Sequence, residues 1–224
     1  MMKNLKILKH KLKGELHFNE THRIIYSTDA SAYKEKPLAV AFPKDIEDVR
    51  EIISFVSSEK KFGPRLGVEP PITLSIIPRG AGTSLAGQVT GKGIIVDVSK
   101  YMNMILNLDV KNKLVTVQPG VILSELNLYL KPYGLFFGPE TSTANRCSIG
   151  GMLGNNACGL HSIIYGSTRD YTHSIKTILS DNSELVFGDL SKSEFHDKLK
   201  LQSLEGRIYR QINDILSDKE IQKK

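Results

Sequence analysis

The residues best suited to bind a ligand begin with a glycine-rich segment, residues 78–88, which we call the first loop. It reads Pro78-Arg79-Gly80-Ala81-Gly82-Thr83-Ser84, and Gly87 and Gln88 come shortly after. Small residues let the backbone approach a ligand closely, and successive N–H groups in such a turn form a concave site that suits a diphosphate. Thr83 and Ser84 add hydroxyl donors, while Arg79 either adds charge or anchors the loop. The loop fits neither GxGxxG nor a Walker sequence, so a simple tight turn is the alternative.

A second glycine-rich segment, residues 138–159, repeats this chemistry about sixty residues later; we call it the second cluster. Its asparagine pair presents donors and acceptors to the edge of a flat heteroaromatic ring. A glycine-rich packing seam between two lobes explains the second cluster about equally well when it is taken alone. The candidate ligand contacts are Pro139, Glu140, Thr141, Ser142, Ser148, Ile149, Gly150, Gly151, Asn155, Asn156, Ala157, Cys158 and Gly159.

Together with Tyr165-Gly166-Ser167-Thr168-Arg169-Asp170, the two segments resemble the FAD domain of the vanillyl-alcohol oxidase and p-cresol methylhydroxylase superfamily. Within it, the stretch from about Leu38 to Gly188 is most similar to D-2-hydroxy-acid dehydrogenases related to glycolate oxidase and D-lactate dehydrogenase, especially long forms fused to an iron–sulfur segment. The resemblance implies an α+β fold of two lobes, each a small sheet with helices, that hold an extended FAD between them.

The resemblance also implies which residues hold the cofactor. Residues 78–84 would bind the diphosphate, and residues 139–142, 148–151 and 155–159 would line the rest of the flavin. Gly87 and Gln88 would touch the ring edge. Ile178 lies on a strand that could meet the adenine, although core packing is the favoured role. Some relatives attach FAD covalently through a histidine near the first loop, and none occurs between Arg79 and Gln88, so we expect non-covalent FAD.

The implied reaction is hydride transfer from a 2-hydroxy acid of the D-lactate, glycolate or D-2-hydroxyglutarate type to the flavin, followed by transfer of electrons to an acceptor. The sequence assigns no catalytic residue. His161 and His173 are weak candidates for a base, because a lone histidine is more often structural. Arg146 and Arg169 could pair with a substrate carboxylate, but flavin binding or packing is favoured. Cys147 and Cys158 are expected to be ordinary core thiols rather than redox or covalent groups.

In that family the chain continues into a substrate domain, a further glycine-rich segment, and catalytic histidine and metal or iron–sulfur ligands, none of which is visible after Gly188. We therefore expect the 224 residues to be the N-terminal part of a longer enzyme and to be inactive alone. An iron–sulfur cluster would belong only to the absent part. A non-catalytic flavin-fold binding module is one alternative. A flavoenzyme similar to UDP-N-acetylenolpyruvoylglucosamine reductase is another, disfavoured by the stretch 155–159.

Hydrophobic periodicity predicts the elements that position these segments. We expect helices at 4–13, from Asp45 through Val56, at 122–130 and around 204–215. Strands are expected at 38–42, 72–77 (a buried strand that ends at Pro78), 94–98 and 114–117, with a hairpin at 175–179 and 184–187 and a loop at 63–71. Together with the resemblance, which implies that the lobes bind FAD, these elements suggest a basic lead-in at 1–36, FAD-binding lobes at 37–100 and 101–190, and a helical tail at 191–224.

The formal net charge of +6 does not indicate a nucleic-acid binder, because the excess lies at the two ends of the chain. Residues 24–189 hold sixteen basic and sixteen acidic side chains. The lysines near the N-terminus are read as a solvated face, and they leave peripheral membrane association open. With two cysteines, no metal-ligand spacing and no secretory or membrane-spanning apolar run, we expect a cytoplasmic protein that binds no metal in this part.

Overall fold

The structure, a computed structural model, describes residues 2–59 and 74–222. These residues form two compact units, Met1–Thr172 and His173–Lys224, and each is described by itself. The fold mixes helices and small sheets, as expected. The domain limits at residues 36, 100 and 190 stay predictions.

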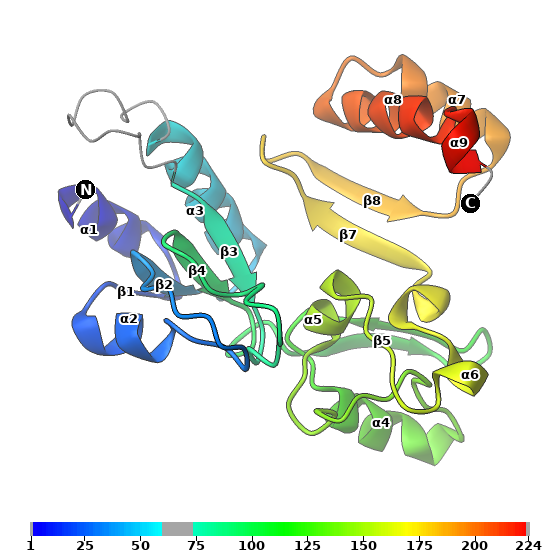
Figure 1. The fold of residues 1–224 in the computed structure, drawn as a ribbon, viewed down its shortest axis with the longest axis horizontal. Helices are drawn as coiled ribbons and strands as arrows, with labels where there is room; N and C mark the ends of the chain where they lie inside the picture. Colours follow the sequence, from blue (N-terminus) through cyan, green and yellow to red (C-terminus); the bar gives the residue numbers. More distant parts are fainter. Residues whose placement is uncertain (1, 60–73, 223–224) are drawn as a thin grey trace. The chain divides into compact units, whose positions relative to one another are not determined.

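The first sheet has four strands in the order β1-β2-β4-β3, which span Glu15–His17, Ala39–Phe42, Ile94–Asp97 and Ile76–Arg79 (Figure 1). Strand β1 runs antiparallel to β2, and β4 runs parallel to both β2 and β3. Parallel strands bring their carboxyl ends to one edge of a sheet, where ligands of α/β folds bind. The first loop leaves β3 at this edge.

Helices α1 (Met2–Lys11) and α3 (Ile46–Glu59) cover one face of this sheet (Figure 1). Leu5 and Leu8 of α1 are buried against Ala39 of β2 and Ile94 of β4 in one cluster. The neighbouring strand residues Val40 and Ile95 point to the opposite face and pack with Tyr26, because side chains alternate along a strand.

The N-terminal region differs from the expected lead-in, because regular structure continues between the first helix and β2. Strand β1 pairs with β2, and α2 (Glu20–Ile25) contacts the same strand. A buried carboxylate ties this region down: Asp48 of α3 accepts the N–H groups of Lys13 and Gly14, at 2.8 and 2.9 Å. The helix predicted at 4–13 is confirmed as α1, and its apolar face lies in the core rather than in a solvated lead-in.

Strand β3 also differs from its prediction. The strand was expected over Ile72 to Ile77 and to end at Pro78, but it spans Ile76–Arg79 and passes through Pro78. Pro78 is tolerated because β3 lies at the edge of the sheet, where a missing N–H costs no pairing. The strand is also only partly buried. Residues 72 and 73, and the predicted loop at 63–71, lie outside the described residues.

The rest of the first unit packs around one helix. Strands β5 (Ile105–Asp109) and β6 (Leu114–Val117) form an antiparallel hairpin whose apolar side chains pack on α4 (Leu123–Leu130). The chain passes Pro132 as a short 3₁₀ turn, Lys131–Tyr133. Strand β5 was not predicted. Three further short elements follow, namely α5 (Ile149–Gly154), α6 (Ser162–Tyr165) and the 3₁₀ turn Thr168–Tyr171.

The second unit confirms the predicted hairpin and the predicted C-terminal helix. Strands β7 (Ser174–Ile178) and β8 (Glu184–Gly188) pair antiparallel, and α8 spans Leu204–Leu216. Helix α7 (Lys192–Lys200), which periodicity did not predict, begins with a capping box of Ser191 and Glu194. Helix α9 spans Lys219–Gln222. Among the described residues, no helix has the length and apolarity to cross a membrane.

Candidate functional site

The first loop presents an unusual row of backbone donors. Gly82 and Gly87 take positive φ values of 68° and 72°, which turn the chain twice in the left-handed region. Within the described part of the chain, no acceptor receives a hydrogen bond from the backbone N–H of any residue between 80 and 86. Unpaired, successive N–H groups on small residues are the donor set that an anion such as a diphosphate requires.

Arg79 anchors the first loop, which is one of the two roles that the sequence left open for it. Its Nη1 donates to the carbonyl of Val89 at 3.3 Å, and its guanidinium carbon lies 5.0 Å from the centre of the Tyr26 ring. A Cβ on Gly82 would lie 2.4 Å from Arg79 Nη2. The guanidinium therefore fills the space directly beneath the turn at Gly82.

The second cluster is built around α5. Ser148, which is buried, caps this helix by accepting the N–H of Gly151 at 3.3 Å. The N–H groups of Ile149 and Gly150 bond to carbonyls of the preceding segment, both at 2.8 Å. A Cβ on Gly150 would lie 2.6 Å from Pro119 Cβ. These glycines thus serve close packing, and their N–H groups are already used within the protein.

The two glycine segments meet within the first unit. A Cβ on Gly80 would lie only 2.1 Å from Ser148 Oγ, so the first loop passes directly over the cap of α5. Gln88 Nε2 donates to Asn155 Oδ1 at 2.9 Å, and Gln88 also accepts the Ser84 hydroxyl. Contacts at both ends of the first loop therefore join it to the second cluster.

The remaining parts of the second cluster also lie together. A Cβ on Gly159 would lie 1.2 Å from the carbonyl oxygen of Glu140, so 139–142 and 155–159 cross in direct contact. The Ala157 carbonyl accepts the buried Thr168 hydroxyl at 2.7 Å. The structure thus brings the predicted residues of the first unit into one region; their contact with flavin stays a prediction.

Segment 165–170 supports this region through a capping box. Asp170 accepts the N–H and the hydroxyl of Ser167, at 2.7 and 2.9 Å, and these bonds lower the pKa of its carboxyl. Asn156, with a positive φ of 45°, accepts the N–H of Arg169 at 2.9 Å. The segment therefore orients the end of the second cluster.

The candidate catalytic side chains have ordinary partners. His161 Nδ1 lies 2.8 Å from Glu140 Oε2, and both side chains are exposed. Arg146 donates to Asn145, while Arg169 lies 3.9 Å from Asp170 and is 80% exposed. Among the described residues of the first unit, these contacts single out neither a catalytic base nor an arginine that would bind a substrate carboxylate.

His173 and Ile178 belong to the second unit, which is described by itself, so neither residue is placed relative to the first loop.

The two cysteines differ in environment. Cys147 is a buried core residue, as expected, and its Sγ lies 3.2 Å from Thr141 Oγ1. Cys158 was expected in the core but is exposed, and its backbone forms an isolated β-bridge with Ser167. Across residues 2–59 and 74–222, no cluster of three histidine, cysteine or acidic side chains could hold a metal ion.

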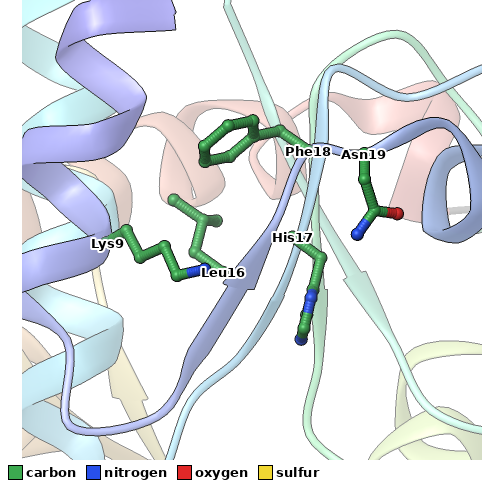
Figure 2. A pocket seen from close by; sticks show the side chains of 5 residues that line it. All are labelled: Lys9, Leu16, His17, Phe18 and Asn19. Carbon is green, nitrogen blue, oxygen red and sulfur yellow. The ribbon is translucent and has the colours of Figure 1, made fainter.

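A pocket of about 370 Å³ lies away from these residues, beside β1. Figure 2 shows Lys9 reaching from α1 toward Leu16, while the His17 ring points in another direction. The ring of His17 stacks on His22 at a centroid distance of 3.8 Å. None of the predicted cofactor contacts lines this pocket, so we regard it as a surface hollow of the N-terminal region.

Sequence reasoning missed one segment that contacts the first loop, residues 26–34. The N–H of Ala30 donates to the carbonyl of Gly82 at 3.0 Å, and the Tyr33 ring packs against Gly87. The polar run through Ser27, Asp29 and Ser31 was the available signal, because short polar side chains close local turns.

The comparisons with known proteins identify the cofactor. The family described as "FAD binding domain" matches residues 37–188. The chain is 36% identical to a D-2-hydroxyglutarate dehydrogenase of Pantoea ananatis, over 89% of this chain and 18% of that protein. It is 32% identical to the glycolate oxidase subunit GlcD of Bacillus subtilis, over 78% of this chain and 35% of that protein.

Solved structures share the fold at lower identity. An alkyldihydroxyacetonephosphate synthase matches with a TM-score of 0.65 and 22% identity, over 83% of this chain and 34% of that chain. The wild-type BBE-like 1 protein of Physcomitrella patens matches with a TM-score of 0.65 and 18% identity, over 82% of this chain and 37% of that chain. The chain thus spans less than a fifth of the D-2-hydroxyglutarate dehydrogenase that it matches. With a row of free N–H groups, two joined glycine segments and a family match over most of its length, the chain belongs to the FAD-binding domains of the p-cresol methylhydroxylase type.

Proposed function

We propose that the chain binds FAD without a covalent bond, with residues 78–84 around the diphosphate and the second cluster along the rest of the flavin. The observation that carries this proposal is the row of unpaired N–H groups at residues 80–86. Each such N–H carries a partial positive charge, and a row of them favours a negatively charged ligand over a neutral one. Small side chains leave room for the ligand to come close.

The test is a titration of the flavin-free chain with FAD and with FMN. FAD carries a diphosphate, whereas FMN carries a single phosphate, so the first loop should favour FAD. We expect at least about tenfold tighter binding of FAD, which corresponds to roughly one additional charge-assisted hydrogen bond. Equal affinity for the two flavins, or binding of neither, would contradict the assignment of the first loop.

We further propose that the complete enzyme oxidises a 2-hydroxy acid and passes the electrons to an acceptor. The names of the relatives, D-2-hydroxyglutarate dehydrogenase and glycolate oxidase subunit, support this substrate class. Bound FAD would supply the hydride acceptor. Residues of this chain would hold and orient it, while a base near the substrate hydroxyl is still required.

The 224-residue chain alone should not oxidise D-lactate, glycolate or D-2-hydroxyglutarate, even with FAD supplied. The physical reason is that the described residues of the first unit show neither a substrate carboxylate site nor an assigned catalytic base around the first loop, and the chain spans 18% of the matched dehydrogenase. The assay compares this chain with a version extended along its reading frame, using a dye acceptor and a panel of D- and L-hydroxy acids. Turnover by the 224 residues would refute the proposal and direct attention to His161 and His173.

We also expect a cytoplasmic location and no nucleic-acid binding. Helix α1 buries Leu5 and Leu8, and its exposed side chains include lysines such as Lys3 and Lys6 together with Ile7. Because a single exposed isoleucine contributes little beside several lysines, any peripheral association through α1 should be mainly electrostatic and should weaken strongly at high salt. Sedimentation with anionic vesicles at low and high salt tests this expectation, and salt-resistant binding would contradict it.

A further inference from the structure

Residues 26–34 contact the first loop at both of its left-handed turns. At the first turn, the N–H of Ala30 donates to the carbonyl of Gly82 at 3.0 Å. At the second turn, a Cβ on Gly87 would lie 2.7 Å from Tyr33 Cδ2, so the ring covers this glycine closely. Segment 26–34 thus contacts the loop where its backbone conformation is least favourable for ordinary residues.

The hydrogen bond from Ala30 has a direct consequence for anion binding. A peptide carbonyl that pointed at a bound diphosphate would repel it, because the oxygen carries partial negative charge. Ala30 satisfies the Gly82 carbonyl on the side of segment 26–34. In the peptide that follows Gly82, the N–H belongs to Thr83 and points away from that carbonyl, as a trans peptide requires. Holding the carbonyl therefore also aims an N–H outward.

A second line of contacts connects the same segment to the sheet. The hydroxyl of Tyr26 donates to Oδ2 of Asp97 at 2.7 Å, and Asp97 is only 4% exposed at the end of β4. Burial and this hydrogen bond raise the pKa of Tyr26, so the phenol keeps its proton. The Tyr26 ring in turn supports Arg79 beneath Gly82. The first loop is thus held through Tyr26 and strand β4 as well as by the direct contacts of Ala30 and Tyr33.

Asp29 lies at the centre of these contacts. Its Oδ1 accepts the N–H of Ser31 at 2.9 Å, which closes the turn that contains Ala30, and Ser31 Oγ in turn accepts the N–H of Tyr33 at 3.1 Å. Burial alone would raise the pKa of the carboxyl, but hydrogen-bond donors from Ser31, then Ser84 and Val89, lower it. Its Oδ2 is buried, and no described residue reaches it with a hydrogen bond of ordinary geometry. The carboxylate therefore stays charged between segment 26–34 and the first loop.

We propose that segment 26–34 positions the first loop for the diphosphate, and that Asp29 is the positioning residue on which this depends. The segment lies outside residues 37–188, which match the family, so the cofactor site extends toward the N-terminus. Asp29 does not touch the ligand; it holds the turn from which Ala30 and Tyr33 contact the loop. The inference rests on the proposed binding of FAD by the first loop.

Charge and positioning make opposite predictions for this carboxylate. A negative side chain near a diphosphate weakens binding through repulsion, so its removal should strengthen binding if charge alone matters. If Asp29 positions the loop, its removal should weaken binding, because the free N–H groups lose their fixed directions. The sign of the change in FAD affinity therefore distinguishes charge repulsion by Asp29 from positioning of the loop by Asp29.

The experiment compares Asp29→Asn with Asp109→Asn in the full 224-residue chain. Asp109 is a matched control, because its Oδ1 also accepts a backbone N–H, that of Asn112 at 3.0 Å, in the β5–β6 hairpin. Amide hydrogen exchange of the flavin-free chain is measured first, followed by titration with FAD and FMN. For Asp29→Asn we expect about tenfold lower protection from exchange at Ala30 and Gln88, whose N–H groups bond to Gly82 and Ser84, and about tenfold weaker FAD binding, with FMN changed less than about twofold. For Asp109→Asn we expect neither.

Three results would overturn the proposal: unchanged exchange protection at Ala30 and Gln88, FAD binding that is unchanged or tighter, or equal weakening of FAD and FMN. If wild-type chain binds FMN as tightly as FAD, the proposed function fails, and the exchange measurement alone decides whether the segment holds the loop. Should Asp29→Asn lower the melting temperature of the whole chain, Tyr33→Ala replaces it, because the Tyr33 side chain is 62% exposed. Faster exchange at Gln88 and Thr90, whose N–H groups bond to Ser84 and Gly87, is then expected, and unchanged exchange at both overturns the proposal.

Discussion

Substituting Gly80 by alanine should destabilise the chain through one contact. The new Cβ would lie 2.1 Å from Ser148 Oγ, so either the serine side chain rotates or the first loop moves. Rotation would remove the cap of α5, which costs about 1 kcal/mol. Movement of the loop would break the bond from Gln88 to Asn155, which costs a similar amount, about 1 kcal/mol. Alanine also has less conformational freedom than glycine in the unfolded chain, and this offsets about 0.4–1 kcal/mol of the loss in unfolding free energy.

A double-mutant cycle isolates this contact. In a Ser148→Ala background the Oγ is gone, and the remaining approach to the serine Cβ is 3.1 Å, which a small shift relieves. Gly80→Ala should then be neutral or stabilising, so the two substitutions should couple by about 1 kcal/mol. Urea unfolding followed by far-UV circular dichroism measures this, because the chain has no tryptophan.

Gly154→Ala serves as the matched control, because a Cβ at this helical position meets nothing within 4 Å. Alanine there should stabilise the chain by up to about 1 kcal/mol. If Gly80→Ala costs the same in both backgrounds, contact with Ser148 is not the cause and the close approach of the two glycine segments is refuted.

Three further outcomes are expected. Bound flavin should be released by acid precipitation, because no histidine lies between Arg79 and Gln88; colour that stays with the precipitate would contradict non-covalent binding. Leu5→Ala should cost about 2–5 kcal/mol of unfolding free energy, because Leu5 is fully buried, whereas Ile7→Ala, at a side chain that is 52% exposed, should cost little; equal effects would refute the packing of α1. Hydrogen bonds from Lys100, Tyr101 and His17 lower the pKa of Glu15 from 4.5 to about 2, so its stabilising effect is present above pH 4.5 and is lost as the pH falls toward 2. Glu15→Gln should therefore destabilise the chain at pH 7 and not at pH 2, and a pH-independent effect in denaturation curves would contradict this.

The long periodic elements of the fold could be predicted from sequence, and the short ones could not. Helix α3 and the hairpin of β7 and β8 follow clear hydrophobic patterns with turn or cap signals. Strand β1 has three residues and is defined by pairing with distant β2, which no local pattern reveals. Helix α5 lies within a glycine-rich stretch of low helix propensity and depends on its serine cap and on packing against Pro119.

The candidate site could be predicted in its parts but not in its assembly. Glycine spacing indicated a phosphate loop, and its order with the second cluster indicated the family, which the comparisons confirm. The contact between Gly80 and Ser148 joins residues far apart in sequence, so only the folded chain reveals it. The role of Arg79 could likewise not be decided from sequence, because an arginine beside a phosphate loop can either contribute charge or pack through its long aliphatic chain; in the structure its guanidinium lies over the Tyr26 ring.

Both edges of the first sheet resist association with another sheet. An exposed edge strand offers a row of unpaired backbone groups that can template pairing between chains and lead to aggregation. At one edge Pro78 removes a donor from the middle of β3, and at the other β1 has only three residues. The proline that introduces the first loop thus also keeps the parallel strands from growing into an intermolecular sheet.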